Sequence, residues 1–167
     1  MKQDPPTMYY TYFGSPVGEL LLAGEGGALK EIRFPRAGNR ALPGPGWVES
    51  ATELSAALRQ LGEYFAGTRR EFDLRLEPLG TTFQKMVWDA LLAIPFGQTR
   101  SYAAIAASIG RPSATRAVGA ANGANPIPIV IPCHRVIGAN GCLTGYGGGL
   151  PIKETLLRLE RGAWLEA

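Results

Sequence analysis

The sequence of 167 residues has only two cysteines, Cys133 and Cys142, and a single histidine, His134. Two cysteines cannot supply the disulfide framework on which small secreted folds depend. Cys133 and His134 are neighbours, no C-x-x-C pair occurs and there is no second histidine, so a conventional zinc site is excluded as well. We therefore expect reduced thiols, no bound metal and no cofactor.

Long apolar runs are also scarce. The first ten residues contain Asp4 and two prolines and do not resemble a signal peptide. The long uncharged stretch 117–134 contains Pro126, Pro128 and Pro132, which disfavours a membrane helix and favours turns and a buried strand. Hydrophobic residues make up 46% and charged residues 19% of the chain, as is usual for folded proteins. We expect a folded, monomeric protein of the cytoplasm.

Carboxylates are missing from one part of the chain. Residues 1–79 hold nine Lys or Arg and ten Asp or Glu, whereas residues 80–167 hold eight and four. No carboxylate lies between Asp89 and Glu154. The cationic residues of that stretch are Arg100, Arg111, Arg116, Arg135 and Lys153. Such a surface suits a polyanion such as DNA, although a buried Ala/Gly-rich core would give the same pattern.

The first half of the chain predicts a small α+β domain. Residues 8–34 read as three strands of an antiparallel meander, separated by glycine-containing turns. We expect residues 35–49 to form a loop and a helix to begin near Ser50, where Ser50 and Glu53 match a capping box. The alternation in residues 71–77 predicts another strand. No motif in this half carries chemistry.

The second half predicts a mostly helical domain that opens near Gly80. A helix follows Thr81, which matches a capping box with Gln84. Two Ala-rich helices then flank residues 109–112, with Ser113 expected as the N-cap of the second. This spacing is typical of a helix-turn-helix, but a plain helical hairpin has the same signal.

The second helix of this hairpin has a nearly bare surface. Arg116 is its only charge, and Ala114, Ala117 and Gly119 leave little side chain around it. Few of its residues could read bases in a major groove. We interpret the helix as a surface for close contact with a minor groove, with Arg116 free to enter the base stack.

A reactive segment follows at Pro132, Cys133, His134 and Arg135. A free cysteine is most often a small buried hydrophobe. The cationic, carboxylate-free surroundings of Cys133 predict instead a lowered thiol pKa and an accessible thiolate. Neighbours on an extended segment point to opposite sides, so a water bridge between Cys133 and His134 fits better than a direct ion pair.

The segment IPCHRVIGANGCLTGYGGG, residues 131–149, resembles the active-site signature of the O6-alkylguanine-DNA alkyltransferases, also called methylated-DNA–protein-cysteine methyltransferases. It follows Arg-Ala-Val-Gly at 116–119 and Asn125-Pro126 in the order typical of that family. The resemblance is strong over residues 80–162. It implies an α+β fold, in which an N-terminal domain (1–79) has a small antiparallel sheet and a helix in ribonuclease-H-like topology. The C-terminal domain (80–167) is then mostly helical, with a winged-helix-like helix-turn-helix.

The resemblance also implies a reaction, the single-turnover transfer of an alkyl group to Cys133. The donor is O6-alkylguanine, and less efficiently O4-alkylthymine, flipped out of double-stranded DNA. His134 takes the thiol proton through a water, and Glu160 orients that histidine. Asn125 forms the hinge after the recognition helix, and Tyr102 donates a hydrogen bond to the flipped guanine. The thioether product is a poor leaving group, so the protein acts once.

The DNA contacts and the substrate pocket carry over in the same way. Arg116 replaces the extruded base in the stack. The other implied DNA contacts are Ala114, Ala117, Gly119 and Arg135. The implied pocket residues are Tyr102, Val136, Tyr146 and Gly147. The zinc ligands of some family members are absent here, as is the tryptophan that replaces the cysteine in inactive relatives.

Two other functions stay open on the residues alone. A regulator could use the same helix-turn-helix to bind a palindromic DNA sequence, which would give Cys133 no task. A cysteine hydrolase could use Cys133 with His134.

Overall fold

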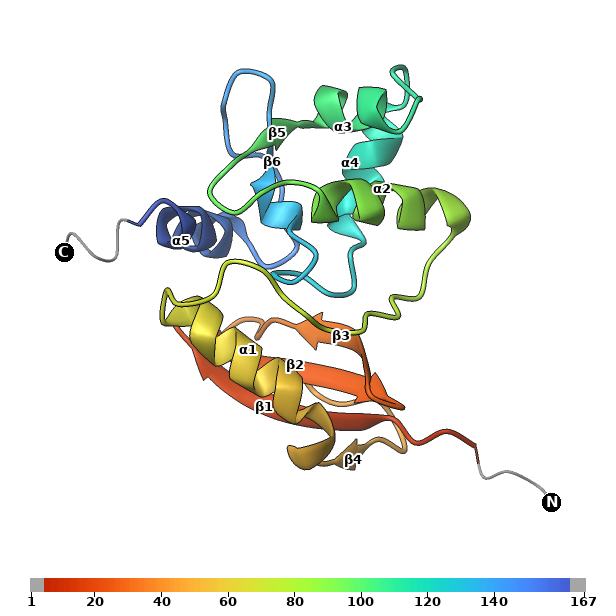
Figure 1. The fold of residues 1–167 in the computed structure, drawn as a ribbon, viewed down its shortest axis with the longest axis vertical. Helices are drawn as coiled ribbons and strands as arrows, with labels where there is room; N and C mark the ends of the chain where they lie inside the picture. The colour runs from red at the N-terminus through yellow and green to blue at the C-terminus, as the bar shows by residue number, and fades with distance from the viewer. Residues whose placement is uncertain (1–4, 163–167) are drawn as a thin grey trace. The chain divides into compact units, whose positions relative to one another are not determined.

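The computed structural model describes residues 5–162, and the chain divides into two compact units, Met1–Pro78 (unit 1) and Leu79–Ala167 (unit 2) (Figure 1). The outer ends of the two expected domains, 1–4 and 163–167, lie outside the described residues. Unit 1 combines a sheet with a helix and unit 2 is mostly helical, which confirms the α+β prediction.

The sheet of unit 1 is the predicted meander with one addition. Strands β1 (Tyr9–Ser15), β2 (Gly18–Glu25) and β3 (Ala28–Arg33) pair antiparallel. A short strand β4 (Val48–Glu49) pairs in parallel with β1, so part of the expected 35–49 loop belongs to the sheet. The order is β3-β2-β1-β4. Five consecutive buried residues in the middle of β2, residues 20–24, show that both faces of the sheet are covered.

Helix α1 (Ser55–Phe65) covers one of these faces. Phe13 of β1 stacks on Phe65 with ring centroids 6.1 Å apart. The helix begins later than the prediction near Ser50, because a 3-10 turn, Thr52–Leu54, precedes it. The Ser50 hydroxyl still accepts the backbone N–H of Glu53 at 3.4 Å, as one half of the expected capping box.

The prediction of a strand at residues 71–77 was wrong. This segment makes a single bridge to the sheet, between Leu76 and Leu29. That bridge consists of two backbone hydrogen bonds, from the Leu29 N–H to the Arg75 carbonyl at 2.8 Å and from the Glu77 N–H to the Leu29 carbonyl at 3.0 Å. The buried Gln60 of α1 holds the segment at Asp73: its side-chain amide donates to the Asp73 carbonyl at 2.9 Å and accepts the Asp73 N–H at 2.8 Å. Residues 71–77 are therefore an extended segment held by one bridge and one side chain, which the alternation alone could not distinguish from a strand.

Unit 2 begins with α2 (Thr82–Leu92), capped by Thr81 and Gln84 in the predicted reciprocal arrangement. The two Ala-rich helices are α3 (Tyr102–Ser108) and α4 (Thr115–Gly123), in the predicted positions. Ser113 is not the N-cap of α4. Ala114 holds that position, and no side chain caps the helix. Trp88 of α2 fixes α4 by donating its indole N–H to the Ala121 carbonyl at 2.9 Å.

The chain then forms a 3-10 turn, Cys133–Arg135, strand β6 (Val136–Ile137) and helix α5 (Leu150–Glu160). Strand β6 pairs in parallel with β5 (Arg100–Ser101), directly before α3.

The buried strand expected before Cys133 is absent from the described fold. Residues 126–132 form turns, with one isolated bridge between Pro128 and Ile131 and a left-handed backbone at Ile129 (φ 74°). The three prolines of this segment lack the N–H groups that a strand would use. Among residues 5–162, no helix is long and apolar enough to cross a membrane.

Candidate active site

Two asparagines at the end of α4 fix the turn that carries Cys133. The side-chain amide of Asn125 donates to the Ile131 carbonyl at 2.8 Å and accepts the Ile127 N–H at 3.0 Å. Asn122, which is buried, donates to the Cys133 carbonyl at 3.3 Å. Asn125 thus lies at the hinge position expected from the sequence, and the side chain of Asn122 is an anchor that the sequence analysis missed.

Cys133 is buried, with 4% of the residue exposed. Burial raises the pKa of this thiol, and hydrogen bonds with Asn125 and Tyr146 and the charge of Lys153 only partly offset that rise. The predicted lowered pKa was therefore wrong, because it counted cationic neighbours and left out desolvation. At neutral pH Cys133 rests as a thiol and requires a base to become a nucleophile.

A buried ionic cluster lies beside Cys133. His134 Nε2 lies 2.7 Å from a carboxylate oxygen of Glu160, and the Arg135 guanidinium donates to both Glu160 oxygens at 2.7 to 3.2 Å. Both members of the His134–Glu160 pair are buried. The resemblance of the sequence to its family implied that Glu160 pairs with His134, and the structure brings the two side chains together.

The cluster sets the charges of its members. Burial alone would raise the pKa of Glu160, but the hydrogen bonds and charges of His134 and Arg135 outweigh it and lower that pKa to about 2. Burial lowers the pKa of His134, against the hydrogen bond and charge of Glu160. At neutral pH Glu160 is therefore ionised and His134 is neutral. A neutral His134 that donates from Nε2 to Glu160 leaves Nδ1 as an acceptor.

Arg135 does not lie where the sequence analysis expected it. It is buried, and besides Glu160 it donates to the Ile94 carbonyl at 2.7 Å, so it cannot meet a DNA phosphate. Lys153, which was counted with the cations of the carboxylate-free stretch, is also buried. A sequence signal for the burial of Lys153 was available in α5: Lys153, Leu156, Leu157 and Glu160 recur at the spacing of one buried helix face.

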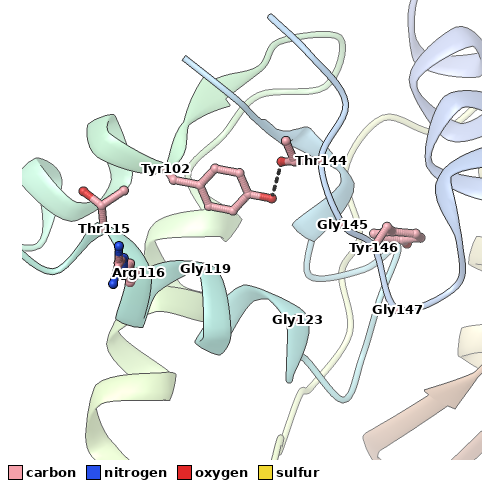
Figure 2. A pocket seen from close by; sticks show the side chains of 9 residues that line it. All are labelled: Tyr102, Thr115, Arg116, Gly119, Gly123, Thr144, Gly145, Tyr146 and Gly147. Atoms are coloured by element: carbon pink, nitrogen blue, oxygen red, sulfur yellow. Dashed lines mark hydrogen bonds between the residues drawn. The ribbon is translucent and has the colours of Figure 1, made fainter. Parts of the chain in front are cut away.

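A pocket of about 500 Å³ opens between the helical hairpin and the segment after β6 (Figure 2). Its lining residues are Tyr102, Thr115, Arg116, Gly119, Gly123, Thr144, Gly145, Tyr146 and Gly147. Three of the four expected pocket residues are among them. Val136 is not, because it is fully buried. Tyr146 lines the pocket and also interacts with the Cys133 thiol, whose pKa it lowers, so it links the pocket to the sulfur.

The surface of α4 next to this pocket is as bare as its sequence suggested. Arg116 and Ala117 are exposed, and Ala114 and Gly119 are half-buried. A Cβ atom on Gly119 would lie 3.9 Å from the Tyr102 ring, so the glycine leaves the wall of the pocket open. Arg116 reaches from this surface to the rim of the pocket (Figure 2). Within residues 5–162, no group of three His, Cys, Asp or Glu side chains could hold a metal ion.

The second helix of a helix-turn-helix borders a pocket, and a buried cysteine beside that pocket is followed in the chain by a neutral histidine that is paired with an ionised carboxylate. This arrangement defines a DNA-binding protein with a cysteine nucleophile. Family models give this class a specific identity. The model described as 6-O-methylguanine DNA methyltransferase, DNA binding domain, matches residues 82–162, and the ribonuclease-like domain of the same methyltransferase matches residues 8–78. The chain belongs to the 6-O-methylguanine DNA methyltransferase family.

Relatives with similar sequences bear related names. A methylated-DNA–protein-cysteine methyltransferase of Methanosarcina acetivorans is 54% identical over 153 residues, which are 92% of this chain and 98% of the relative. One of Mycobacterium bovis is 50% identical over 159 residues, 92% of this chain and 93% of the relative. The crystal structure of Mycobacterium tuberculosis OGT in complex with DNA superposes with a TM-score of 0.85 at 51% identity, covering 92% of this chain and 93% of that one.

Proposed function

We propose that this protein repairs DNA by moving the alkyl group of O6-alkylguanine to Cys133. The observation that carries the proposal is the position of Cys133, which contacts the pocket through Tyr146 and is followed directly by the buried His134–Glu160 pair. Named relatives are methylated-DNA–protein-cysteine methyltransferases, and a similar structure holds DNA. We include O4-alkylthymine as a poorer substrate.

The reaction begins with the thiol proton. Nδ1 of His134 is buried and has no hydrogen-bond partner among the described residues. One water between this nitrogen and Cys133 Sγ would carry the proton from sulfur to His134. Glu160, held ionised by Arg135, stabilises the imidazolium that forms. The Cys133 thiol and the neutral His134 imidazole thus act as one acid–base pair.

The transfer itself is a displacement at saturated carbon. The Cys133 sulfur forms a bond to the alkyl carbon as the bond between that carbon and O6 breaks, and the electron pair of the broken bond stays on the guanine. The guanine takes up one proton, so a thiol and an alkylated base become a thioether and an unmodified base. Tyr102 donates a hydrogen bond to the departing guanine and stabilises its developing negative charge. Nothing in the reaction calls for a cofactor.

DNA binds to unit 2. The bare surface of α4, with Ala114, Ala117 and Gly119, lies against the minor groove, and Arg116 fills the space that the flipped base leaves. Residues 80–167 therefore form the domain for DNA binding and alkyl transfer, and residues 1–79 an N-terminal domain without reactive groups. We place the protein in the cytoplasm as a monomer.

Incubation with O6-benzylguanine tests the proposal, with mass spectrometry of the intact protein and of its peptides. We expect one benzyl group on the peptide that contains Cys133 and none on Cys142. A regulator would gain no adduct, and a cysteine hydrolase would release its product and return to the original mass. Either result would refute alkyl transfer.

A further inference from the structure

Thr144 makes a contact in the pocket that the reaction above does not use. Figure 2 shows Tyr102, at the start of α3, facing Thr144, which lies in the segment between β6 and α5. The Thr144 hydroxyl donates to the phenol oxygen of Tyr102 at 3.1 Å. Two hydroxyl groups that are 42 residues apart in the sequence are therefore held together at the pocket wall.

This contact determines what the Tyr102 hydroxyl can do. A phenol has one proton to donate and lone pairs that accept. With Thr144 donating into the oxygen, the proton of Tyr102 is left for a ligand in the pocket. A hydroxyl that accepts one hydrogen bond also becomes a better donor of another. Thr144 thus both orients and polarises the group that is to meet the departing base.

Lys153 holds Thr144 in place. Lys153 lies on the buried face of α5, and its ammonium group donates to the Thr144 carbonyl at 2.9 Å and to the Val136 carbonyl at 2.6 Å. Val136 pairs with Arg100, two residues before Tyr102. The paired strands β5 and β6 therefore position both hydroxyls: β5 leads directly into Tyr102, and β6 binds the Lys153 side chain that holds Thr144.

A buried lysine is a costly way to fix a loop, since desolvation disfavours its charge and lowers its pKa. The segment that it fixes has glycines at 145 and 147, so little else in its sequence restricts the backbone. A positioning role for Thr144 gives a reason for a buried ammonium group to bind the Thr144 carbonyl.

We propose that Thr144, anchored by Lys153, is a positioning residue that directs the Tyr102 hydroxyl at the base in the pocket. The inference rests on the proposed function, which makes Tyr102 the donor to the departing guanine. Thr144 acts through Tyr102 and touches no reacting atom.

A double-mutant cycle tests this role. The variants are Thr144→Val, Tyr102→Phe and the pair together, and the readouts are the limiting rate of benzyl transfer from O6-benzylguanine and the half-saturating concentration. We expect Thr144→Val to lower the limiting rate by about three- to tenfold, the value of one hydrogen bond. The double variant should be no slower than Tyr102→Phe alone. Thr144→Ser, which keeps the hydroxyl, should restore most of the loss.

Thr155→Val is the matched control. The Thr155 hydroxyl donates to the Pro151 carbonyl within α5, away from the pocket lining, so the same chemical change should leave transfer at the wild-type rate. Full transfer by Thr144→Val, or losses that multiply in the double variant, would overturn the positioning role.

The same cycle in a Cys133→Ser background separates this inference from the proposed function. O6-benzylguanine binding, measured by calorimetry, reports the coupling of Thr144 and Tyr102 without any transfer. Coupled binding losses in this background, together with no benzyl transfer by the wild-type protein that keeps Cys133, would refute the proposed function and support the positioning role. Independent binding losses in this background, together with benzyl transfer by the wild-type protein, would refute the positioning role alone.

Discussion

The two units place their polar side chains in different ways. The buried polar residues described in unit 1 are Thr11 and Gln60, and its ion pairs, such as Lys30–Glu25 and Arg40–Glu19, lie at the surface. Among its described residues, up to position 162, unit 2 buries five that are polar or charged: Asn122, His134, Arg135, Lys153 and Glu160. All five bond to one another or to the backbone around Cys133, Val136 and Thr144. Buried charge costs free energy, so its concentration beside one cysteine supports the proposal that the chemistry occurs there.

The largest effect should come from the sulfur itself. We expect Cys133→Ser to abolish transfer, because a serine hydroxyl stays protonated beside His134 at neutral pH, while DNA binding persists. Cys142→Ser is the matched control, since Cys142 is exposed and outside the cluster, and it should react like the wild type. Transfer above background in Cys133→Ser would remove the cysteine from the mechanism.

Glu160→Gln should affect rate and stability together. Loss of the carboxylate leaves Arg135 buried without its charge partner, which costs about 3–5 kcal/mol of unfolding free energy. His134 becomes a weaker base, and we expect benzyl transfer to slow by roughly tenfold or more. Iodoacetamide labelling of Cys133 across a pH series measures the second effect, and a profile identical to that of the wild type would limit Glu160 to a role in stability.

The pH dependence of stability follows from the same carboxylate. The folded-state pKa of Glu160 is about 2, below the ordinary value of 4.5, so its contribution is complete above pH 4.5 and is lost as the pH falls toward 2. The lowered pKa of His134 adds a loss that begins below pH 6.5, as the unfolded chain takes up the proton first. Thermal melts should show Tm falling below pH 6.5 in the wild type, with the Glu160 part missing in Glu160→Gln. A Tm that does not change between pH 7 and pH 3 would contradict both assignments.

Arg116→Ala should slow transfer from duplex DNA far more than transfer from the free base. Extruding a base costs a few kcal/mol, which an inserted side chain partly offsets, so we expect repair of an alkylated duplex to slow by about tenfold. Transfer from free O6-benzylguanine requires no flipping and should stay near the wild-type rate. Equal losses on both substrates would give Arg116 a role in the pocket instead of the base stack.

Gln60→Leu tests whether the buried polar residues of unit 1 serve stability alone. It removes the buried amide that holds Asp73 and should lower the unfolding free energy by about 1–3 kcal/mol. Below the melting temperature the rate of transfer should not change, because no reactive group lies in unit 1. A slower reaction at full folding would show that unit 1 takes part in the chemistry.

The smallest effect concerns salt. With Arg135 and Lys153 buried, the exposed cations between residues 90 and 153 are Arg100, Arg111 and Arg116. If Arg116 enters the stack, two remain for phosphates, and log K against log salt should fall with a slope near about −2. Arg111→Ala should remove about one unit of that slope, as fluorescence anisotropy on unmodified duplexes would show. An unchanged slope would place Arg111 away from the backbone.

Much of the fold could be predicted because local chemistry determined it. The meander of unit 1 follows from alternation and glycine turns, and the start of α2 from the Thr81–Gln84 box. Errors occurred where partners distant in sequence decide the outcome. Strand β4 exists because β1 offers it an edge, and residues 71–77 are held by Gln60 and one isolated bridge rather than by a ladder.

The site shows the same division. Cys133, His134 and Glu160 could be named from the sequence through a family signature. The direction of the thiol pKa could not, because it depends on burial. Arg135 was expected to contact DNA, and Lys153 was counted among the cations of a surface suited to a polyanion, because charged residues are mostly exposed. Only the buried stripe of α5, which contains Lys153 and Glu160, argued otherwise. Thr144 offered no signal in the sequence, since its role depends on a contact with Tyr102 across 42 residues.

The most direct test of the central claim uses a duplex with a single O6-methylguanine. Protein in increasing amounts is mixed with this duplex, and both the methylated peptide and the restored guanine are counted by mass spectrometry. We predict one methyl group per protein molecule, carried on Cys133, and one guanine restored for each, with no further reaction when more duplex is added. Continued turnover, or a methyl group on another residue, would contradict the account.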